Sequence, residues 1–213
     1  MSLKLHFLRH GQTASSRDND FCGSGTDALL TAEGEEMAQA FADHYQDMAW
    51  RAIYSSPQRR ALATVRPLCT AIELESEVRD GLKEIGYGAW EGKTLETVRR
   101  EYGEDYRRWQ DDPAWHAPTD GESARDVAQR ALGVIGEIHQ HCDDGNVLVV
   151  SHKATIRIML CSLLGIDLST YRFRLGCPVG SISVVEFGAR GPLLHVLADR
   201  THLEARLRDL PGT

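Results

Sequence analysis

Apolar and polar residues alternate at the start of the chain. Leu3, Leu5 and Phe7 are separated by polar residues. This period of two is typical of a strand that buries one face. We therefore expect a first strand that ends near Arg9. A loop is expected over 11–27, because that stretch is rich in Ser, Asp, Asn and Gly.

Four helices are expected, over 31–45, 57–71, 123–141 and 154–164. In 31–45 and 123–141, apolar residues recur three and four positions apart, the spacing of an amphipathic helix. Ser56 is a good capping residue, and Pro57 suits the first position of a helix. Arg59 and Arg60 then fall in the first turn of the second helix.

Strands are expected between these helices. The segments concerned are 52–54, 72–78, 146–150, 181–187 and 193–198. The apolar run 147–150 has no polar alternation, which indicates a strand buried on both faces. Alternating strands and helices predict an α/β fold, a three-layer sandwich with a mostly parallel central sheet and helices on both faces. Ligand sites in such sheets collect beyond the carboxyl ends of the strands.

The stretch 81–120 does not follow this alternation. It holds Glu84 and three of the four tryptophans, Trp90, Trp109 and Trp115. We interpret it as a mainly helical, cap-like insertion over the active site. The chain has 213 residues, of which 42% are hydrophobic and 26% charged, as in a folded globular protein. We expect one domain over 1–213 that includes this insertion.

Charge and cysteine content narrow the function classes. The formal net charge is -7, which argues against general binding to nucleic acid or to an anionic membrane. The five cysteines lack metal-ligand spacing, and residues 1–4 show no secretory leader. This favours reduced thiols and a cytoplasmic protein. The longest apolar run, 158–166, is far shorter than the ~20 residues that a membrane helix needs.

Three predicted strands lead directly into basic residues. Arg9-His10-Gly11 follows the first strand, Arg59-Arg60 the second and His152-Lys153 the buried one. If these ends converge, two imidazoles and at least two guanidiniums face one cavity. Guanidiniums match phosphate oxygens with paired, charge-assisted hydrogen bonds, and helix amino termini add partial positive charge. The pattern predicts a site for a phosphoryl group.

Six motifs occur in order along nearly the whole chain. They are Leu8-Arg9-His10-Gly11-Gln12-Thr13, Leu30-Thr31-Ala32-Glu33-Gly34, Tyr54-Ser55-Ser56-Pro57-Gln58-Arg59-Arg60-Ala61, Leu82-Lys83-Glu84 before Gly88-Ala89-Trp90-Glu91-Gly92, Gly121-Glu122-Ser123, and Val149-Val150-Ser151-His152. The chain thereby resembles the histidine phosphatase superfamily, which includes cofactor-dependent phosphoglycerate mutase and many small-molecule phosphatases. A lone Arg-His-Gly is a weak signal, whereas six motifs in order are a strong one.

The resemblance implies a role for each matching residue. His10 is the implied nucleophile, which forms a covalent phosphohistidine. Arg9 and Arg60 are expected to hold the phosphoryl oxygens, and His152 to donate another hydrogen bond. Glu84 is the implied proton donor. The resemblance implies no metal and no cofactor.

Other residues are assigned to phosphate or substrate binding. They are Gln12, Thr13, Ser16, Cys22, Gly23 and Lys153. Arg60 is preferred to Arg59 because the arginine of the family immediately precedes the alanine of this motif. Arg59 is therefore expected to be an exposed neighbour. Cys22 lies in a loop that should border the pocket.

Two positions depart from the family pattern. Ser16 stands where the family commonly has an asparagine that touches phosphate, and Asn19 is a candidate replacement. Lys153 stands where glycine is usual. Its backbone amide can still serve the phosphate. Its ammonium group is expected either to meet a second anionic group on the substrate, such as a carboxylate, or to face solvent.

The motifs favour a metal-independent phosphatase that acts on small-molecule phosphate monoesters. Cofactor-dependent phosphoglycerate mutase is the main alternative, but the chain lacks the Trp-Asn pair that mutases usually carry after Arg-His-Gly. A non-catalytic phosphate-binding module is a further alternative. Glu91 could replace Glu84 as the acid if the insertion packs differently. The other histidines show no regular metal spacing, which disfavours a metallohydrolase.

Overall fold

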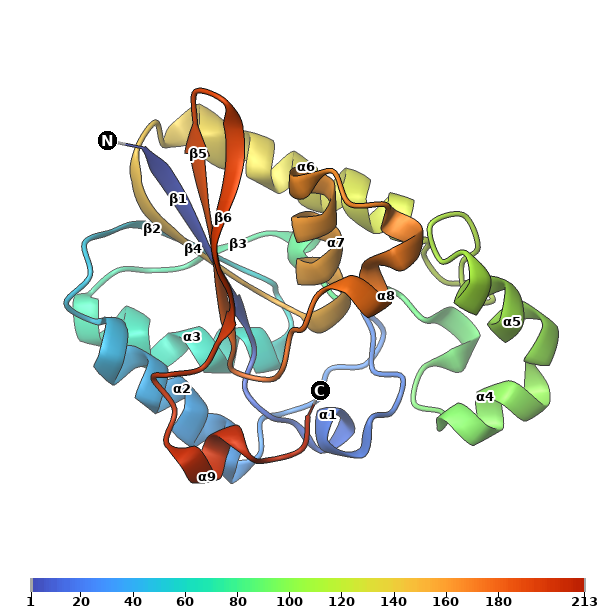
Figure 1. Cartoon of the computed structure of the whole chain (residues 1–213). Coiled ribbons are helices and arrows are strands. Elements are labelled where there is room, and N and C mark those ends of the chain that lie inside the picture. Colours follow the sequence, from blue (N-terminus) through green and yellow to red (C-terminus); the bar gives the residue numbers. More distant parts are fainter. Residues whose placement is uncertain (1, 213) are drawn as a thin grey trace.

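The computed structural model describes residues 2–212, and a six-stranded sheet runs through this part of the chain (Figure 1). Its strands are β1 (Leu3–Arg9), β2 (Trp50–Ser55), β3 (Glu77–Val78), β4 (Gly145–Ser151), β5 (Ile182–Gly188) and β6 (Gly191–Asp199). Their order in the sheet is β3-β2-β4-β1-β5-β6. The first four are parallel, whereas β5 is antiparallel to β1 and β6 to β5. The predicted mostly parallel α/β sheet is confirmed.

Helices cover both faces of the sheet (Figure 1). On one face lie α2 (Ala32–Tyr45) and α3 (Arg59–Ile72), and on the other α6 (Ala124–His141) and α7 (Lys153–Leu164). The shorter helices are α1 (Ala14–Asp18), α4 (Leu95–Glu101), α5 (Gly103–Asp111), α8 (Tyr171–Arg174) and α9 (Ala205–Arg208). Three single 3₁₀ turns are η1 (Asp80–Leu82), η2 (Gly88–Trp90) and η3 (Leu168–Thr170).

The side chains of β4 pack against the helices on both faces of the sheet. Val147 and Val149 pack in the core below α6 and α7, whereas Leu148 and Val150 pack in the core below α2 and α3. Successive strand residues point to opposite faces of a sheet. A strand between two helical layers must therefore be apolar at every position, and the predicted buried strand is confirmed.

Helix α3 begins two residues later than predicted. Its capping position is Gln58, whose side chain makes no capping hydrogen bond. The Ser56 hydroxyl lies instead 2.8 Å from Nε2 of His152 and 3.3 Å from the backbone nitrogen of Gln58. The prediction that Ser56 caps this helix is wrong, because its hydroxyl is used in a tertiary contact.

Two connecting segments also differ from prediction. The predicted loop after β1 contains α1, which begins with a capping box. The Thr13 hydroxyl accepts from the Ser16 backbone N–H at 3.1 Å, and the Ser16 hydroxyl accepts from the Thr13 N–H at 2.9 Å. The predicted strand 72–78 pairs only over Glu77–Val78, because α3 continues to Ile72.

The segment 81–120 contains short helices and turns around a small aromatic core. Trp90, Val98, Tyr106 and Trp109 form this core. Phe21, from the loop after β1, contacts it with a distance of 5.5 Å between its ring centroid and that of Trp90. The predicted insertion therefore lies against the loop that follows the first strand. Figure 1 shows α4 and α5 on the same side of the molecule as α8.

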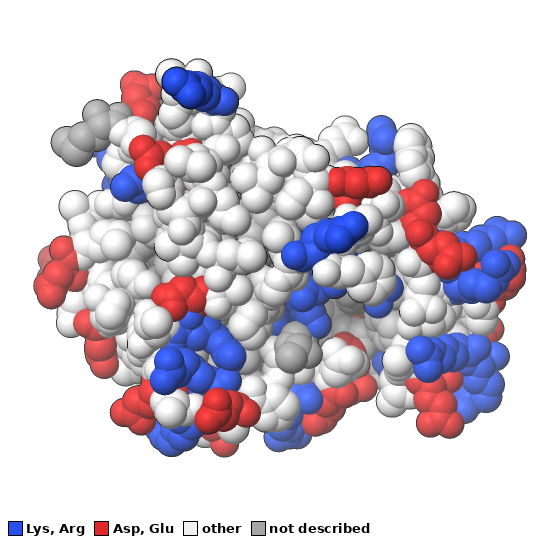
Figure 2. Space-filling model, viewed as in Figure 1, with Lys and Arg blue, Asp and Glu red and all other residues white. Residues whose placement is uncertain are grey.

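Acidic and basic side chains are interspersed on the molecular face seen in Figure 2. No region of one sign covers this face, and a broad uncharged area lies between the charged groups. This mixture accompanies a formal net charge of -7. Attraction of an anionic ligand therefore depends on groups gathered locally rather than on the overall charge.

The amino end of α2 touches the loop after β1 through two glycines. A methyl group on Gly34 would lie 2.1 Å from the carbonyl oxygen of Gln12. One on Gly11 would lie 2.5 Å from the carbonyl oxygen of Gly34. Only residues without a Cβ permit this approach. The contact holds α2 against the residues that follow His10.

We expect Gly34→Ala to lower the free energy of unfolding by ~1–3 kcal/mol, because the added methyl group overlaps the Gln12 carbonyl. Gly136→Ala is the matched control, since Gly136 lies in α6 with nothing within 4 Å of an added methyl group. Alanine is favoured over glycine in a helix by ~1 kcal/mol, so the control should be more stable than the parent. Urea unfolding measures the free energy of unfolding of both variants. If Gly34→Ala were also more stable than the parent, the tight contact between Gly34 and Gln12 would be contradicted.

Candidate active site

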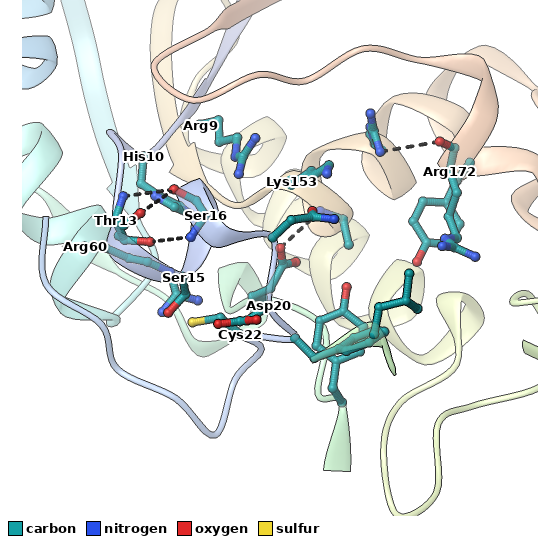
Figure 3. A pocket seen from close by; sticks show the side chains of 18 of the residues that line it. Arg9, His10, Thr13, Ser15, Ser16, Asp20, Cys22, Arg60, Lys153 and Arg172 are labelled. Carbon is teal, nitrogen blue, oxygen red and sulfur yellow. Dashed lines mark hydrogen bonds between the residues drawn. The ribbon is translucent and has the colours of Figure 1, made fainter. Parts of the chain in front are cut away.

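A cavity of about 350 Å³ opens beyond the carboxyl ends of β1 and β4 (Figure 3). Four of the five predicted catalytic residues line it: Arg9, His10, Arg60 and Glu84. The predicted binding residues that line it are Thr13, Ser16, Cys22 and Lys153. Gln12, Gly23 and His152 lie outside this lining. The candidates therefore divide into residues that face the cavity and residues that lie behind it.

His10 follows β1 directly. Its backbone N–H donates to the Ser151 carbonyl at 3.1 Å, next to the pairing of β1 with β4. Its ring Nδ1 lies 2.7 Å from the Gly11 carbonyl oxygen. A carbonyl only accepts hydrogen bonds, so Nδ1 carries the hydrogen. The free electron pair of the neutral ring is therefore on Nε2.

His152 follows β4 and lies beside His10, with 5.1 Å between the ring centroids. The Nε–H of Arg60 donates to His152 Nδ1 at 3.1 Å. His152 Nε2–H then donates to the Ser56 hydroxyl oxygen at 2.8 Å. The structure brings the two histidines together. Both ring nitrogens of His152 bond within the protein, so this residue orients Arg60 from behind the cavity.

Burial and nearby positive charge lower the pKa of both histidines well below the usual 6.5. Burial is the largest cause for each, followed by the charge of Arg60. Arg9 lowers the pKa of His10 further. A lowered pKa favours the neutral imidazole. His10 is therefore a free base near neutral pH.

Arg60 is held by backbone carbonyls on the side away from His152. It is 1% exposed and donates to the carbonyl oxygens of Thr26 at 2.8 Å and Gly23 at 3.2 Å. Arg59, its neighbour in α3, is exposed. Successive helix residues point about 100° apart, which explains why one arginine enters the cavity and the other does not.

Arg9 is anchored by the carboxyl-terminal part of the described chain. Its Nη1 donates to the carbonyl oxygens of Cys177 at 2.7 Å and Gly212 at 2.9 Å. Its Nε is buried and has no hydrogen-bond partner among residues 2–212. Burial lowers the pKa of Arg9 to about 10, so the guanidinium remains charged at neutral pH.

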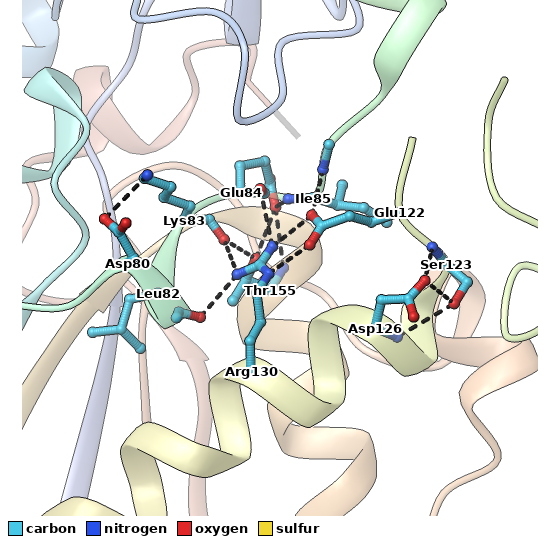
Figure 4. Close-up of polar contacts among 12 residues, drawn as sticks. Asp80, Leu82, Lys83, Glu84, Ile85, Glu122, Ser123, Asp126, Arg130 and Thr155 are labelled. Atoms are coloured by element: carbon cyan, nitrogen blue, oxygen red, sulfur yellow. Dashed lines mark hydrogen bonds and ion pairs between the residues drawn. The ribbon is translucent and has the colours of Figure 1, made fainter. Parts of the chain in front are cut away.

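Glu84 lies at the amino end of α7 and is 6% exposed (Figure 4). Its Oε1 accepts hydrogen bonds from the backbone N–H groups of Ile85 at 2.9 Å and Thr155 at 3.1 Å, and from the Thr155 hydroxyl at 3.1 Å. Its Oε2 accepts one from the Ala154 N–H at 3.2 Å. These contacts fix the carboxyl group at the edge of the cavity and leave Oε2 the less occupied oxygen.

Glu91, the alternative acid, has a different environment. Its carboxylate accepts from the Gly23 N–H at 2.9 Å, the Thr26 hydroxyl at 2.7 Å and the Tyr87 N–H at 3.1 Å. It does not line the cavity, whereas Glu84 does. Glu91 thus ties the loop after β1 to the segment 81–120.

Two polar residues that were predicted to bind phosphate or substrate, Gln12 and Ser16, have hydrogen-bond partners within the protein. The Gln12 amide donates to the Pro211 carbonyl at 2.7 Å and accepts from the Thr31 hydroxyl at 3.0 Å. Gln12 therefore does not face the cavity. The Ser16 hydroxyl is used in the cap of α1, while Asn19 lines the cavity.

Several lining residues were not identified from the sequence. They are Ser15, Asp20, Phe21, Tyr87, Leu95, Tyr106, Ala154, Arg157, Tyr171, Arg172 and Phe173. Arg157 could have been found, because it lies four positions after Lys153 and therefore on the same side of a helix. Arg172 carried no such signal, since only the tertiary packing of α8 places it at the cavity.

Within residues 2–212, no group of three or more His, Cys, Asp or Glu side chains is arranged to hold a metal ion. The described helices include none that is both long and apolar enough to cross a membrane. Cys22, Cys69, Cys142, Cys161 and Cys177 are all free thiols.

A family model described as histidine phosphatase superfamily (branch 1) matches residues 5–200 of the chain. The chain is 32% identical over 201 residues to phosphoserine phosphatase 1 of Hydrogenobacter thermophilus, covering 94% of each protein. It is 27% identical to adenosylcobalamin/alpha-ribazole phosphatase of Escherichia coli, covering 93% of this chain and 97% of that protein.

Solved structures share this fold over nearly their whole length. Bacillus stearothermophilus YhfR aligns with a TM-score of 0.88 and 26% identity, covering 95% of this chain and 100% of that one. A mycobacterial glucosyl-3-phosphoglycerate phosphatase in complex with inorganic phosphate aligns with a TM-score of 0.82 and 27% identity, covering 94% and 99%. The match to the family model, over residues 5–200, includes all the residues that line the cavity.

The lowered pKa values of His10 and His152 predict that both rings stay neutral as the pH falls from about 7.5 to about 6. An ordinary histidine, with a pKa near 6.5, becomes mostly protonated over this interval. NMR titration of ¹⁵N-labelled histidine side chains, assigned with His10→Gln and His152→Gln, measures this directly. Free histidine in the same tube is the control. If His10 became protonated over the same pH range as free histidine, the conclusion that its pKa is lowered would be contradicted.

Proposed function

The chain belongs to the histidine phosphatase superfamily (branch 1) and is a phosphatase for small phosphate monoesters, and we propose that it works through a phosphohistidine on His10 with Glu84 as proton donor. The observation that carries this proposal is the hydrogen bond from His10 Nδ1 to the Gly11 carbonyl, at 2.7 Å. It leaves the electron pair of Nε2 available in a ring that borders a cationic cavity. Orientation of this kind is what an activated nucleophile requires.

In the first step, His10 Nε2 attacks phosphorus and the bond from phosphorus to the ester oxygen breaks. The negative charge on the phosphoryl oxygens is stabilised by the guanidiniums of Arg9 and Arg60. Both arginines are already hydrogen-bonded in place, so they need little reorganisation during the reaction. The leaving alkoxide takes a proton from Glu84, for which the less occupied Oε2 is the suitable oxygen.

In the second step, water attacks the phosphohistidine and transfers a proton to the Glu84 carboxylate. The bond between phosphorus and Nε2 then breaks, and inorganic phosphate leaves. His10 returns to its neutral form and Glu84 to its acid form. The two steps require no oxidant, reductant or additional cofactor.

The names of the relatives favour hydrolysis over the mutase alternative. Phosphoserine phosphatase 1 and adenosylcobalamin/alpha-ribazole phosphatase are both phosphatases by name, and the chain covers more than nine tenths of each. Their identities to this chain, 32% and 27%, do not carry their substrates over. We therefore propose that the protein hydrolyses phosphate monoesters and that the other residues of the cavity select the substrate.

The intermediate is tested by acid-free denaturing quench after mixing the enzyme with a ³²P-labelled phosphate monoester. We expect a labelled protein whose phosphate bond is stable in base and labile in acid. His10→Ala should give no label and lose on the order of 10³ or more in kcat, because the nucleophile is removed. Equal labelling of parent and variant would place the covalent step on another residue.

Glu84→Gln tests the acid role through the leaving group. Single-turnover phosphorylation by an alkyl phosphate should slow ~10²–10⁴-fold, because the alkoxide needs a proton. Phosphorylation by p-nitrophenyl phosphate should slow much less, because nitrophenolate leaves without one. Glu91→Gln is the matched control and should affect both substrates alike. Equal slowing of the two substrates by Glu84→Gln would contradict the assignment.

A further inference from the structure

The cavity continues beyond the residues that hold the phosphoryl group. Figure 3 shows His10 at one side, Arg172 at the other and Lys153 between them. Arg157 lines the same cavity from α7, one helical turn or ~6 Å along the helix from Lys153. We refer to Arg157 and Arg172 as the distal cations. No step of the proposed reaction at phosphorus uses their side chains.

The protein leaves part of the hydrogen-bonding capacity of the distal cations unused. Nε of Arg157 and Nη1 of Arg172 are buried and lack a partner among the described residues. Unpaired buried donors on charged groups are unfavourable and are uncommon in folded proteins. Two such groups at one end of a cavity indicate a binding function rather than a structural one.

The positions of the two arginines are nevertheless defined. The guanidinium carbon of Arg172 lies 3.8 Å from the ring centroid of Trp109, a cation–π contact. Arg157 Nη1 lies 3.5 Å from the Arg172 carbonyl oxygen. Stacking on the indole holds the plane of the guanidinium without neutralising its charge. The contacts thus preorganise positive charge at the cavity wall.

The charge of the lining exceeds what a phosphoryl group requires. The described lining holds four arginines, Arg9, Arg60, Arg157 and Arg172, besides Lys153, and two carboxyl groups, those of Asp20 and Glu84. Glu84 is in its acid form at the start of the proposed reaction, so the four guanidiniums exceed the one remaining carboxylate by three positive charges. A phosphate monoester carries about −1.5 to −2 at neutral pH. At least one positive charge therefore remains without an anion after the phosphoryl group is bound.

We infer that the substrate carries a second anionic group, a carboxylate or a further phosphate, which binds the distal cations while the phosphoryl group lies at His10. Guanidiniums bind either oxyanion with paired hydrogen bonds. The inference rests on the proposed function, since it places the first phosphoryl group at the nucleophile. It defines the substrate class by the spacing of two anionic groups across one cavity.

The electrostatics of Lys153 agree with this inference. Burial and the neighbouring charges of Arg9 and Arg157, in that order, lower the pKa of Lys153 to about 8. The ammonium group is therefore mostly protonated at neutral pH, but like charges oppose it. A second anion bound at Arg157 would add an opposite charge nearby, which favours the protonated ammonium group.

Matched pairs of substrates test the inference. The first pair is 3-phosphoglycerate and glycerol 3-phosphate, which differ by a carboxylate in place of a hydroxymethyl group. The second is fructose 1,6-bisphosphate and fructose 6-phosphate, which differ by a phosphate. We expect kcat/KM to favour the doubly anionic member of at least one pair by about tenfold or more. The favoured pair identifies the second group as carboxylate or phosphate, and no preference in either pair overturns the inference.

Variants of the distal cations identify the groups responsible. Arg157→Met and Arg172→Met should each reduce the preference of the favoured pair by about tenfold, mainly by raising KM for the doubly anionic member. Arg172→Lys should retain part of the preference, because it keeps the charge. Arg174→Met is the matched control, since Arg174 lies in the same helix as Arg172 but is exposed and does not line the cavity. A preference that persists in both methionine variants would overturn the inference.

Hydrolysis of p-nitrophenyl phosphate separates failure of this inference from failure of the proposed function. This substrate has no second anionic group. If the parent hydrolyses it and His10→Ala does not, the proposed function stands, and equal kcat/KM values within both pairs then reject only the second-anion site. If the parent gives neither hydrolysis nor a labelled intermediate with any of the five substrates, the proposed function itself is rejected.

Discussion

The parallel pairing of β1 with β4 is the constraint on which the site depends. Arg9 is paired with Ser151, so His10 and His152 leave the sheet at the same level. The 3.1 Å hydrogen bond from His10 N–H to the Ser151 carbonyl extends this register by one residue. A slip of one residue would turn every side chain of β1 to the opposite face. The register that pairs β1 with β4 therefore also determines where the imidazoles lie.

Arg9 and Arg60, which we propose to bind the phosphoryl group, are held by neutral acceptors. Carbonyl oxygens of Thr26 and Gly23 hold Arg60, and carbonyls of Cys177 and Gly212 hold one end of Arg9. A carboxylate in these places would also fix the guanidinium, but it would neutralise the charge that an anionic ligand needs. The retained charge has a second effect, because it helps to keep the pKa of His10 low. One arrangement thus favours both anion binding and a neutral His10.

Several loops are joined behind the cavity by single side chains. Glu91 connects the loop after β1 to the segment 81–120, and Gln12 connects that loop to Pro211. Arg130 donates to the carbonyls of Gly81, Lys83 and Glu84 and pairs with Glu122 (Figure 4). These contacts position the backbone of Glu84 and the loop that follows His10. Substitutions behind the cavity are therefore expected to affect its shape as well as stability.

The sequence by itself determined the main strands and helices, and it indicated the residues that we propose to react. Periodicity is a local property, and the motif around His10 lies within a few positions. Only the tertiary structure decided which partners these residues have. It directs Ser56 to His152 rather than to the helix end, turns Gln12 away from the cavity, and places Arg172 across from His10. The physical reason is that hydrogen bonds and charges act between segments far apart along the chain, whose approach no local pattern records.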